Sequence, residues 1–142
     1  MARGYKVEHK GFTFRSKFEH RIAVDLETRG VNYDYEREEW EYFTKVRNGV
    51  CKDCNGIHVY QRRWYTPDFF LPNGIVIEAK GQFTASNRVT LKAIREVHDS
   101  VDLRLVFMAN NRISKASGTT YVDWCEQFGF KYSIGRIPDE WL

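Results

Sequence analysis

The fold is decided by residues 66–81, which read TPDFFLPNGIVIEAKG. Apolar residues flank a Pro-Asn-Gly turn, and this pattern predicts an antiparallel β-hairpin. With the turn centred on Asn73, Asp68 falls directly opposite Glu78, and residues paired in this way have Cβ atoms about 4.5–5.5 Å apart. Lys80 projects from the same face as Glu78, because side chains alternate along a strand. Two carboxylates and a lysine are therefore expected to converge at one end of the hairpin.

This arrangement of charges predicts a bound cation. Like charges placed opposite each other destabilise a sheet, so an ion is expected between the two acids. The expected ion is Mg²⁺ or Mn²⁺, since hard divalent ions prefer oxygen ligands. The alternative for Asp68 is a turn aspartate after a proline, and for Lys80 a solvated lysine at a strand end. Their shared face with Glu78 favours a functional site.

Length and composition indicate one domain. The chain has 142 residues, of which 42% are hydrophobic and 15% aromatic, which is enough to bury a core. The sequence contains no apolar run of about 18 residues, so no membrane span is expected. The N-terminus lacks the apolar segment of a signal peptide, which favours a cytoplasmic location. Three cysteines without an export signal argue against a disulfide framework.

Charge is unevenly distributed, although the net charge is only +3. Residues 1–22 and 45–63 are rich in lysine and arginine, whereas residues 31–42 are acidic. Basic segments on both sides of an acidic centre suit a polyanion held around a metal site. Ordinary surface charge is the alternative interpretation, and both remain open at this point.

Periodicity predicts a mixed α/β domain in which helices flank a central sheet. Ser16 begins a capping box with Glu19, and the helix that follows is expected to end at Gly30. A second helix is expected to begin at Ser86 or Asn87. The other expected elements are a strand at 31–36, the hairpin at 66–80, a strand at 103–107, a helix at 120–128 and a strand at 130–134.

Pro67-Asp68, nine intervening residues and Glu78-Ala79-Lys80 resemble the signature of the PD-(D/E)xK nuclease superfamily, whose core has the order αβββαβ. More narrowly, the chain resembles the phage endonuclease I family of Holliday-junction-resolving enzymes. The resemblance rests on these blocks in order: FRS at 14–16 with Glu19, YDYE at 33–36, TPDF at 66–69, LPNGI at 71–75, EAKG at 78–81, RLVF at 104–107 and IPDEW at 137–141. It implies an α/β, restriction-endonuclease-like core and an intertwined homodimer.

The resemblance also implies the catalytic set, namely Glu19, Asp68, Glu78 and Lys80. Asp68, Glu78 and the backbone carbonyl of Ala79 are expected to hold one Mg²⁺ or Mn²⁺ ion. Glu19 and Asp68 are expected to hold a second ion, about 3.5–4 Å from the first. On the sequence alone, a structural role for Glu19 is open as well, because a capping-box glutamate returns to the backbone of its serine.

Further residues follow from the same resemblance. Asp34 stands where the family carries an acid, usually a glutamate. It is a candidate for contacting the metal ligands without binding the metal itself. Residues 1–13 are expected to form a basic N-terminal arm. The candidate DNA-binding residues are Arg3, Lys6, Lys10 and Arg15.

Residues 41–64 form an inserted segment that is longer than in the family and contains the pair Cys51 and Cys54. This CxxC resembles half of a structural zinc site, which His58 or a second subunit would have to complete. A pair of free thiols in a loop is the alternative, and the sequence leaves both open. The segment is expected to bridge the two subunits of the homodimer.

The expected function is that of a metal-dependent, structure-selective DNA endonuclease. It is expected to resolve four-way (Holliday) junctions and other branched DNA by paired phosphodiester hydrolysis in the host cell cytoplasm. One alternative is a sequence-specific or repair endonuclease on the same core. Another is a non-catalytic, zinc-containing DNA-binding module, against which the intact set of Asp68, Glu78 and Lys80 argues.

Overall fold

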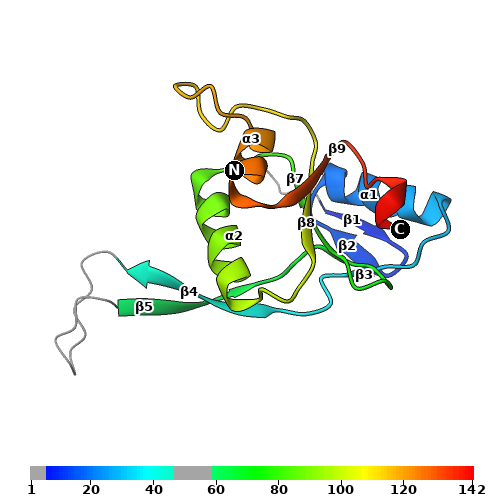
Figure 1. The fold of residues 1–142 in the computed structure, drawn as a ribbon. Coiled ribbons are helices and arrows are strands. Elements are labelled where there is room, and N and C mark those ends of the chain that lie inside the picture. Colours follow the sequence, from blue (N-terminus) through cyan, green and yellow to red (C-terminus); the bar gives the residue numbers. More distant parts are fainter. Residues whose placement is uncertain (1–5, 47–58) are drawn as a thin grey trace.

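The computed structural model describes residues 6–46 and 59–142, and Figure 1 shows their arrangement. A mixed sheet of five strands in the order β3-β6-β7-β8-β9 forms its centre. Its strands are β3 (Asp34–Tyr35), β6 (Phe69–Phe70), β7 (Val76–Lys80), β8 (Leu103–Phe107) and β9 (Lys131–Ile134). The first three pair antiparallel, whereas β7, β8 and β9 run parallel. The prediction of a mixed α/β domain with a central sheet is confirmed.

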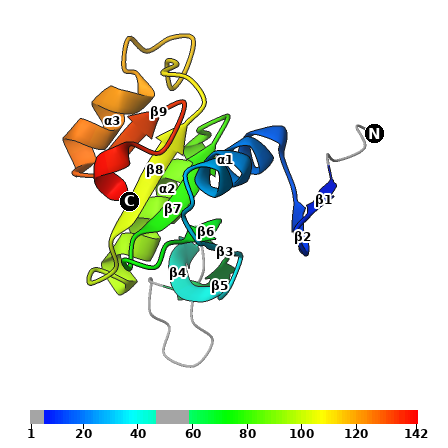
Figure 2. The same cartoon turned by 90° about the vertical axis from the view of Figure 1, so that its right-hand side faces the viewer.

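Helices cover both faces of this sheet, as Figure 2 shows. They are α1 (Lys17–Thr28), α2 (Ala85–Val97) and α3 (Tyr121–Phe128). On one face, Ile22 and Leu26 of α1 are buried in a core cluster with Ile77 of β7. On the other face, a second cluster joins Leu91 of α2 and Trp124 of α3 to the strands. Burial of these apolar side chains between the helices and the sheet holds the layers together.

The helix ends agree with the sequence in two cases and differ in one. Ser16 caps α1, and Gly30 follows its end with a left-handed φ of +70°. The predicted start of α2 at Ser86 or Asn87 is wrong, because Thr84 is its N-cap. The Asn87 side chain accepts a hydrogen bond from the Thr84 backbone amide at 3.1 Å, so it completes a capping box instead of starting the helix.

The hairpin that joins β6 and β7 has the predicted register. Phe69 lies opposite Ile77 and Phe70 lies opposite Val76, so the pairing continued by one residue sets Asp68 across from Glu78. Gly74 at the turn has a φ of +89°, which a residue with a Cβ rarely adopts. The strand predicted at 31–36 is shorter than expected, since only the two residues of β3 pair with β6.

Two antiparallel ribbons were not predicted as such. β1 (Val7–His9) pairs with β2 (Phe12–Phe14) ahead of α1, where an N-terminal arm is expected. β4 (Trp40–Val46) pairs with β5 (Val59–Tyr65) within the inserted segment. Figure 1 shows the β4–β5 ribbon projecting from the body of the molecule beside α2. A short 3₁₀ turn, η1 (Asp139–Trp141), ends the chain.

Without the ribbons, the elements around the hairpin follow the order α1-β3-β6-β7-α2-β8, to which α3 and β9 are added. This is the helix, strand, strand, strand, helix, strand order expected from the sequence. Among the described helices, none has both the length and the apolar character needed to cross a membrane. The candidate zinc ligands Cys51, Cys54 and His58, together with Arg3, lie outside the described residues.

Candidate active site

Asp68 and Glu78 lie together at the open end of the β6–β7 hairpin, and each residue is only 3% exposed. Asp68 precedes β6, and its Oδ2 accepts a hydrogen bond of 2.8 Å from the backbone amide of Ala79. This bond ties the aspartate to the opposite strand and fixes the orientation of its carboxylate. The local pairing of the hairpin therefore brings together two acids that are ten residues apart in the sequence.

Lys80 forms an ion pair with Glu78. Its Nζ lies 2.8 Å from Glu78 Oε1, and the lysine side chain is 17% exposed. The second oxygen, Glu78 Oε2, is buried without a hydrogen-bond partner in the described part of the chain. A buried carboxylate oxygen is normally bonded, so Oε2 is the oxygen of Glu78 that is available to a further donor or a cation.

Glu19 reaches this group from the first turn of α1. Its carboxylate accepts hydrogen bonds from two hydroxyls, Ser16 Oγ at 2.9 Å and Tyr35 Oη of β3. The Ser16 hydroxyl also accepts from the Glu19 backbone amide at 3.1 Å. The serine therefore caps the helix, while the glutamate side chain turns toward the strand β3. Glu19 is 9% exposed, and its charge acts on both Asp68 and Glu78.

The electrostatics of the site disfavour two ionised acids. Burial, followed by the charges of Glu78 and Glu19, raises the pKa of Asp68 well above its ordinary value. Burial also raises the pKa of Glu78, although Lys80 opposes this shift. For Lys80, burial alone would lower the pKa, but the Glu78 carboxylate outweighs it and the pKa is raised. The lysine therefore remains a cation at neutral pH.

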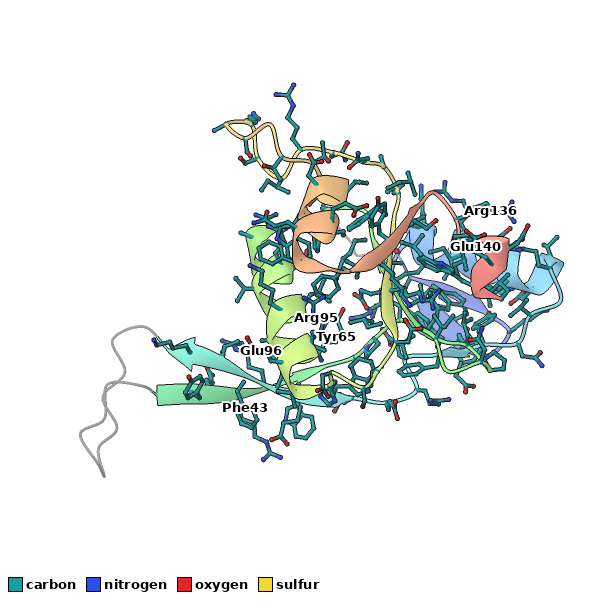
Figure 3. The ribbon with its side chains drawn as sticks, in the orientation of Figure 1. Phe43, Tyr65, Arg95, Glu96, Arg136 and Glu140 are labelled. Carbon is teal, nitrogen blue, oxygen red and sulfur yellow. The ribbon has the colours of Figure 1, made fainter. Side chains whose placement is uncertain are left out.

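Tyr65 lies beside this group, although no motif in the sequence points to it. It ends β5 and packs against the clusters on the α2 side of the sheet; Figure 3 labels it there. Its hydroxyl is buried, and in the described part of the chain it makes no hydrogen bond of ordinary geometry. It is nevertheless close enough to Glu78 to lower the pKa of that carboxyl. Only the tertiary fold brings this strand end to the hairpin.

Arg15 and Glu36 are the other neighbours of Asp68. The guanidinium of Arg15 forms an ion pair with Glu36 and lies 4.0 Å from Asp68 Oδ1. The Glu36 backbone amide donates to the Asp68 carbonyl at 2.9 Å. Asp34, the acid selected from the sequence, is 56% exposed and pairs with Arg37 at 3.3 Å. The structure therefore brings Glu36 to the site and does not bring Asp34 there.

The other basic residues selected for DNA binding lie away from the hairpin. Lys6 is exposed ahead of β1. Lys10 lies in the β1–β2 turn, where its Nζ is 3.3 Å from Glu27 Oε2. Since Glu27 follows Glu19 by eight residues on α1, Lys10 is about 12 Å along the helix from the acid cluster. Of the described candidates, Arg15 is the one that the structure places at the site.

The chemistry of the acid pair fits a hard divalent ion. In the described ranges 6–46 and 59–142, no three His, Cys, Asp or Glu side chains are arranged to cage an ion as they stand. Mg²⁺ does not require such a cage, since it commonly binds through one or two carboxylates and keeps several waters. Asp68 and Glu78 supply two carboxylates, and the unpaired Oε2 of Glu78 supplies a free ligand atom. An ion there would also relieve the repulsion that raises the pKa of Asp68.

Buried acids with perturbed pKa values beside a buried lysine are typical of an enzyme active site. The sheet and its helices therefore carry a candidate active site made of acids and a lysine. The sequence matches the family described as phage endonuclease I over residues 1–142, and the chain belongs to this family.

Two phage proteins illustrate this relationship. The chain is 34% identical over 140 residues to Endonuclease I of Escherichia phage T7, a match that covers 98% of this chain and 85% of that protein. It is 35% identical over 130 residues to Endodeoxyribonuclease 1 of Enterobacteria phage T3, covering 91% of this chain and 76% of that protein. Both matches span the whole of the acid and lysine site.

Proposed function

We propose that this protein is a metal-dependent DNA endonuclease that resolves four-way junctions and other branched DNA by paired phosphodiester hydrolysis. The observation that carries the proposal is the buried group of Asp68, Glu78 and Lys80, in which one glutamate oxygen is unpaired. Membership in the phage endonuclease I family supports DNA as the substrate. The order α1-β3-β6-β7-α2-β8 supports a restriction-endonuclease-like core.

Asp68, Glu78 and the Ala79 carbonyl would hold a Mg²⁺ or Mn²⁺ ion, and Glu19 with Asp68 a second one. When bound, such an ion supplies Lewis-acid charge to the phosphate and promotes ionisation of the attacking water. Asp68 is held for this role by its bond from Ala79 to Oδ2, and its other oxygen, Oδ1, lies 4.0 Å from the Arg15 guanidinium. Tyr35 and Ser16 orient the Glu19 carboxylate from the other side.

Lys80 acts in this proposal as a fixed cation. Because its pKa is raised, the ammonium keeps its proton at neutral pH and cannot serve as a general base. It donates hydrogen bonds to the attacking water and offsets the negative charge that develops on the phosphate in the transition state. Its ion pair with Glu78 keeps the ammonium at the site before substrate arrives.

Paired cuts in a junction require two active sites at a fixed separation, so the working species is proposed to be a twofold homodimer. The β4–β5 ribbon supports this assembly, because it projects from the body and exposes large aromatic side chains. Phe43, Tyr60 and Trp64 are 42%, 62% and 54% exposed. Exchange of ribbon strands between subunits would give the intertwined form.

The test is cleavage of a synthetic four-way junction beside a linear duplex of matched sequence. Mg²⁺ should give symmetric cuts in the junction at a rate at least tenfold above that on the duplex, and omission of divalent ions should abolish both reactions. Glu78→Gln should remove cleavage and retain binding of the junction. Equal rates on both DNAs would reject junction selectivity, and cleavage without divalent ions would reject the metal-dependent mechanism.

A further inference from the structure

We propose that the groove between the β4–β5 ribbon and the first turns of α2 binds the DNA backbone, with Arg63 as its principal phosphate ligand. This inference rests on the proposed action of the protein on DNA. The groove has a volume of about 440 Å³. Two cations, Lys45 and Arg63, contribute to its lining together with the hydroxyl of Tyr42 and three serine or threonine hydroxyls, and the lining contains no carboxylate. Such a lining attracts an anion that accepts hydrogen bonds.

Arg63 is held in place without losing its charge. Its Nε donates to Thr44 Oγ1 at 3.1 Å and its Nη2 donates to Gln61 Oε1 at 3.2 Å, and both acceptors are neutral. Within the described part of the chain, no carboxylate lies within ion-pair distance of this guanidinium. A positioned, unneutralised guanidinium with donors to spare is suited to a phosphate group.

Arg62, the adjacent residue, has the opposite character. Its side chain lies on the other face of the ribbon, since neighbours along a strand alternate. Its Nη2 is 2.6 Å from Glu41 Oε2, and its Cζ lies 4.8 Å from the centre of the Trp64 ring. The charge of Arg62 is therefore already neutralised within the ribbon. The two residues are both arginines, but only the guanidinium of Arg63 is unpaired with a carboxylate and available to bind a phosphate.

The other residues that line the groove include both polar and apolar side chains, which suits a nucleic-acid backbone in which phosphates alternate with sugars. Thr44, Ser86 and Thr90 present the hydroxyls, which are common donors to phosphate oxygens. Val89 lines the same groove, and its side chain is 60% exposed on α2. An apolar side chain between polar ones offers a contact for the deoxyribose that separates successive phosphates.

The two walls of the groove lead to the active site. On the ribbon, Tyr65 follows Arg63 by two residues on the same face, about 7 Å along β5, and its hydroxyl lies near Glu78. On the other side, Lys80 at the end of β7 is followed at Thr84 by the N-cap of α2. A DNA strand that leaves the cutting site therefore passes between Arg63 and α2.

The test compares Arg63→Gln with Arg62→Gln, a matched change one residue away. Binding of linear duplex and of four-way junction is measured over a series of salt concentrations without added divalent ions. Arg63→Gln should weaken binding of both DNAs about five- to tenfold and reduce the slope of log K against log salt by about 1. Arg62→Gln should leave the slope unchanged, and Arg63→Lys should restore it.

Phosphate-ethylation interference gives an independent readout, because Arg63→Gln should erase the signal at one phosphate near the cut. Thermal unfolding of each variant controls for loss of the ribbon. Equal slopes for the two glutamine variants, or an unchanged interference pattern, would overturn the proposal. If the wild-type protein binds junction and duplex equally, the role of the groove can still be tested with the duplex alone. If the wild-type protein binds no DNA, both the proposed function and the role of the groove are overturned.

Discussion

The ion pair between Glu78 and Lys80 uses one carboxylate oxygen and leaves the other without a partner. The lysine Nζ lies 2.8 Å from Oε1, while Oε2 is buried and unbonded in the described part of the chain. A buried acceptor left unpaired costs about 1–3 kcal/mol. A cation bound at this oxygen would remove that cost, and the effect can be measured without following cleavage.

The first prediction is that Asp68→Asn stabilises the metal-free protein at neutral pH. Burial and the neighbouring acids raise the pKa of Asp68 in the folded state. Between the unfolded pKa of about 3.9 and the higher folded pKa, the folded state binds more protons, so stability falls as pH rises. Asparagine can still accept the Ala79 bond but carries no charge. The unfolding temperature at pH 7–8 should rise by a few degrees.

At about pH 3 the difference between Asp68→Asn and the wild-type protein should disappear, because the aspartate is then neutral in both states. Mg²⁺ should raise the unfolding temperature of the wild-type protein and not that of the variant. A metal-free wild-type protein that is more stable than Asp68→Asn at pH 8 would contradict the assignment of repulsion at this site.

The second prediction concerns Lys80. Removal of the ammonium by Lys80→Ala should lower the cleavage rate about 10²–10³-fold while binding of DNA changes less than about twofold, since its charge acts mainly in the transition state. Because the pKa of Lys80 is raised, the wild-type rate should not fall between pH 7 and 9 through loss of this charge. Single-turnover cleavage and filter binding measure the two effects. Equal losses in binding and rate would assign Lys80 to affinity instead.

The third prediction concerns the buried hydroxyl of Tyr65. Tyr65→Phe should raise the pKa of Glu78, because the hydroxyl now lowers it, and should weaken apparent Mg²⁺ affinity several-fold. Because a higher folded-state pKa disfavours the ionised carboxylate, the stability of the folded protein at neutral pH should fall slightly. The Mg²⁺ affinity is measured from the Mg²⁺ dependence of cleavage, and the stability from the unfolding temperature with and without Mg²⁺. Tyr60→Phe, on the same strand but 62% exposed, is the control and should change neither.

The hairpin and its acids could be predicted because their pairing is local. The turn at Asn73 fixes the register, and the register alone sets Asp68 against Glu78. The cap at Ser16 and the stop at Gly30 are equally local signals. In each case the residues that interact are close in the sequence.

What could not be predicted depends on distant contacts. Tyr65 and Glu36 reach the site from strand ends whose sequence shows nothing unusual, and Asp34 was preferred to Glu36 on resemblance alone. The pairing of β4 with β5 has no clear signal in the sequence, because residues 60–64 of β5 are all exposed and therefore show no alternation of apolar and polar positions. For α2, several residues are suitable caps, and only the folded geometry selects Thr84.

The fourth prediction concerns Glu27, which ties the β1–β2 ribbon to α1. Burial alone would raise its pKa, but hydrogen bonds from His9, Tyr33 and Lys10 lower the pKa to about 2. The stabilisation is therefore present above the unfolded pKa of about 4.3 and is lost as pH falls toward 2. Glu27→Gln should destabilise the protein at pH 7 by about 1–3 kcal/mol, measured by denaturant unfolding.

That difference should shrink as the pH is lowered from 5 to 2. Glu126→Gln is a suitable control, since Glu126 also accepts a bond from a tyrosine, Tyr132, but on the exposed surface. Its effect should stay within about 0.5 kcal/mol at every pH. A Glu27→Gln effect that is constant with pH would show that packing, not the carboxylate charge, holds the ribbon.

The last prediction concerns assembly. Phe43, Tyr60 and Trp64 lie on the ribbon face that also carries the Arg62–Glu41 pair, since the register sets Phe43 opposite Arg62 and Glu41 opposite Trp64. Figure 3 shows Phe43 on the side of the ribbon away from α2. Exposed aromatic residues gathered on one face are typical of an interface centre, where truncation commonly costs about 2 kcal/mol or more.

Trp64→Gln should therefore raise the dimer dissociation constant more than tenfold, measured by light scattering or analytical ultracentrifugation. Val24→Gln, which changes an apolar side chain that is 40% exposed on α1, should leave it unchanged. A wild-type protein that is monomeric and cuts both strands of a junction at assay concentrations would overturn the dimer.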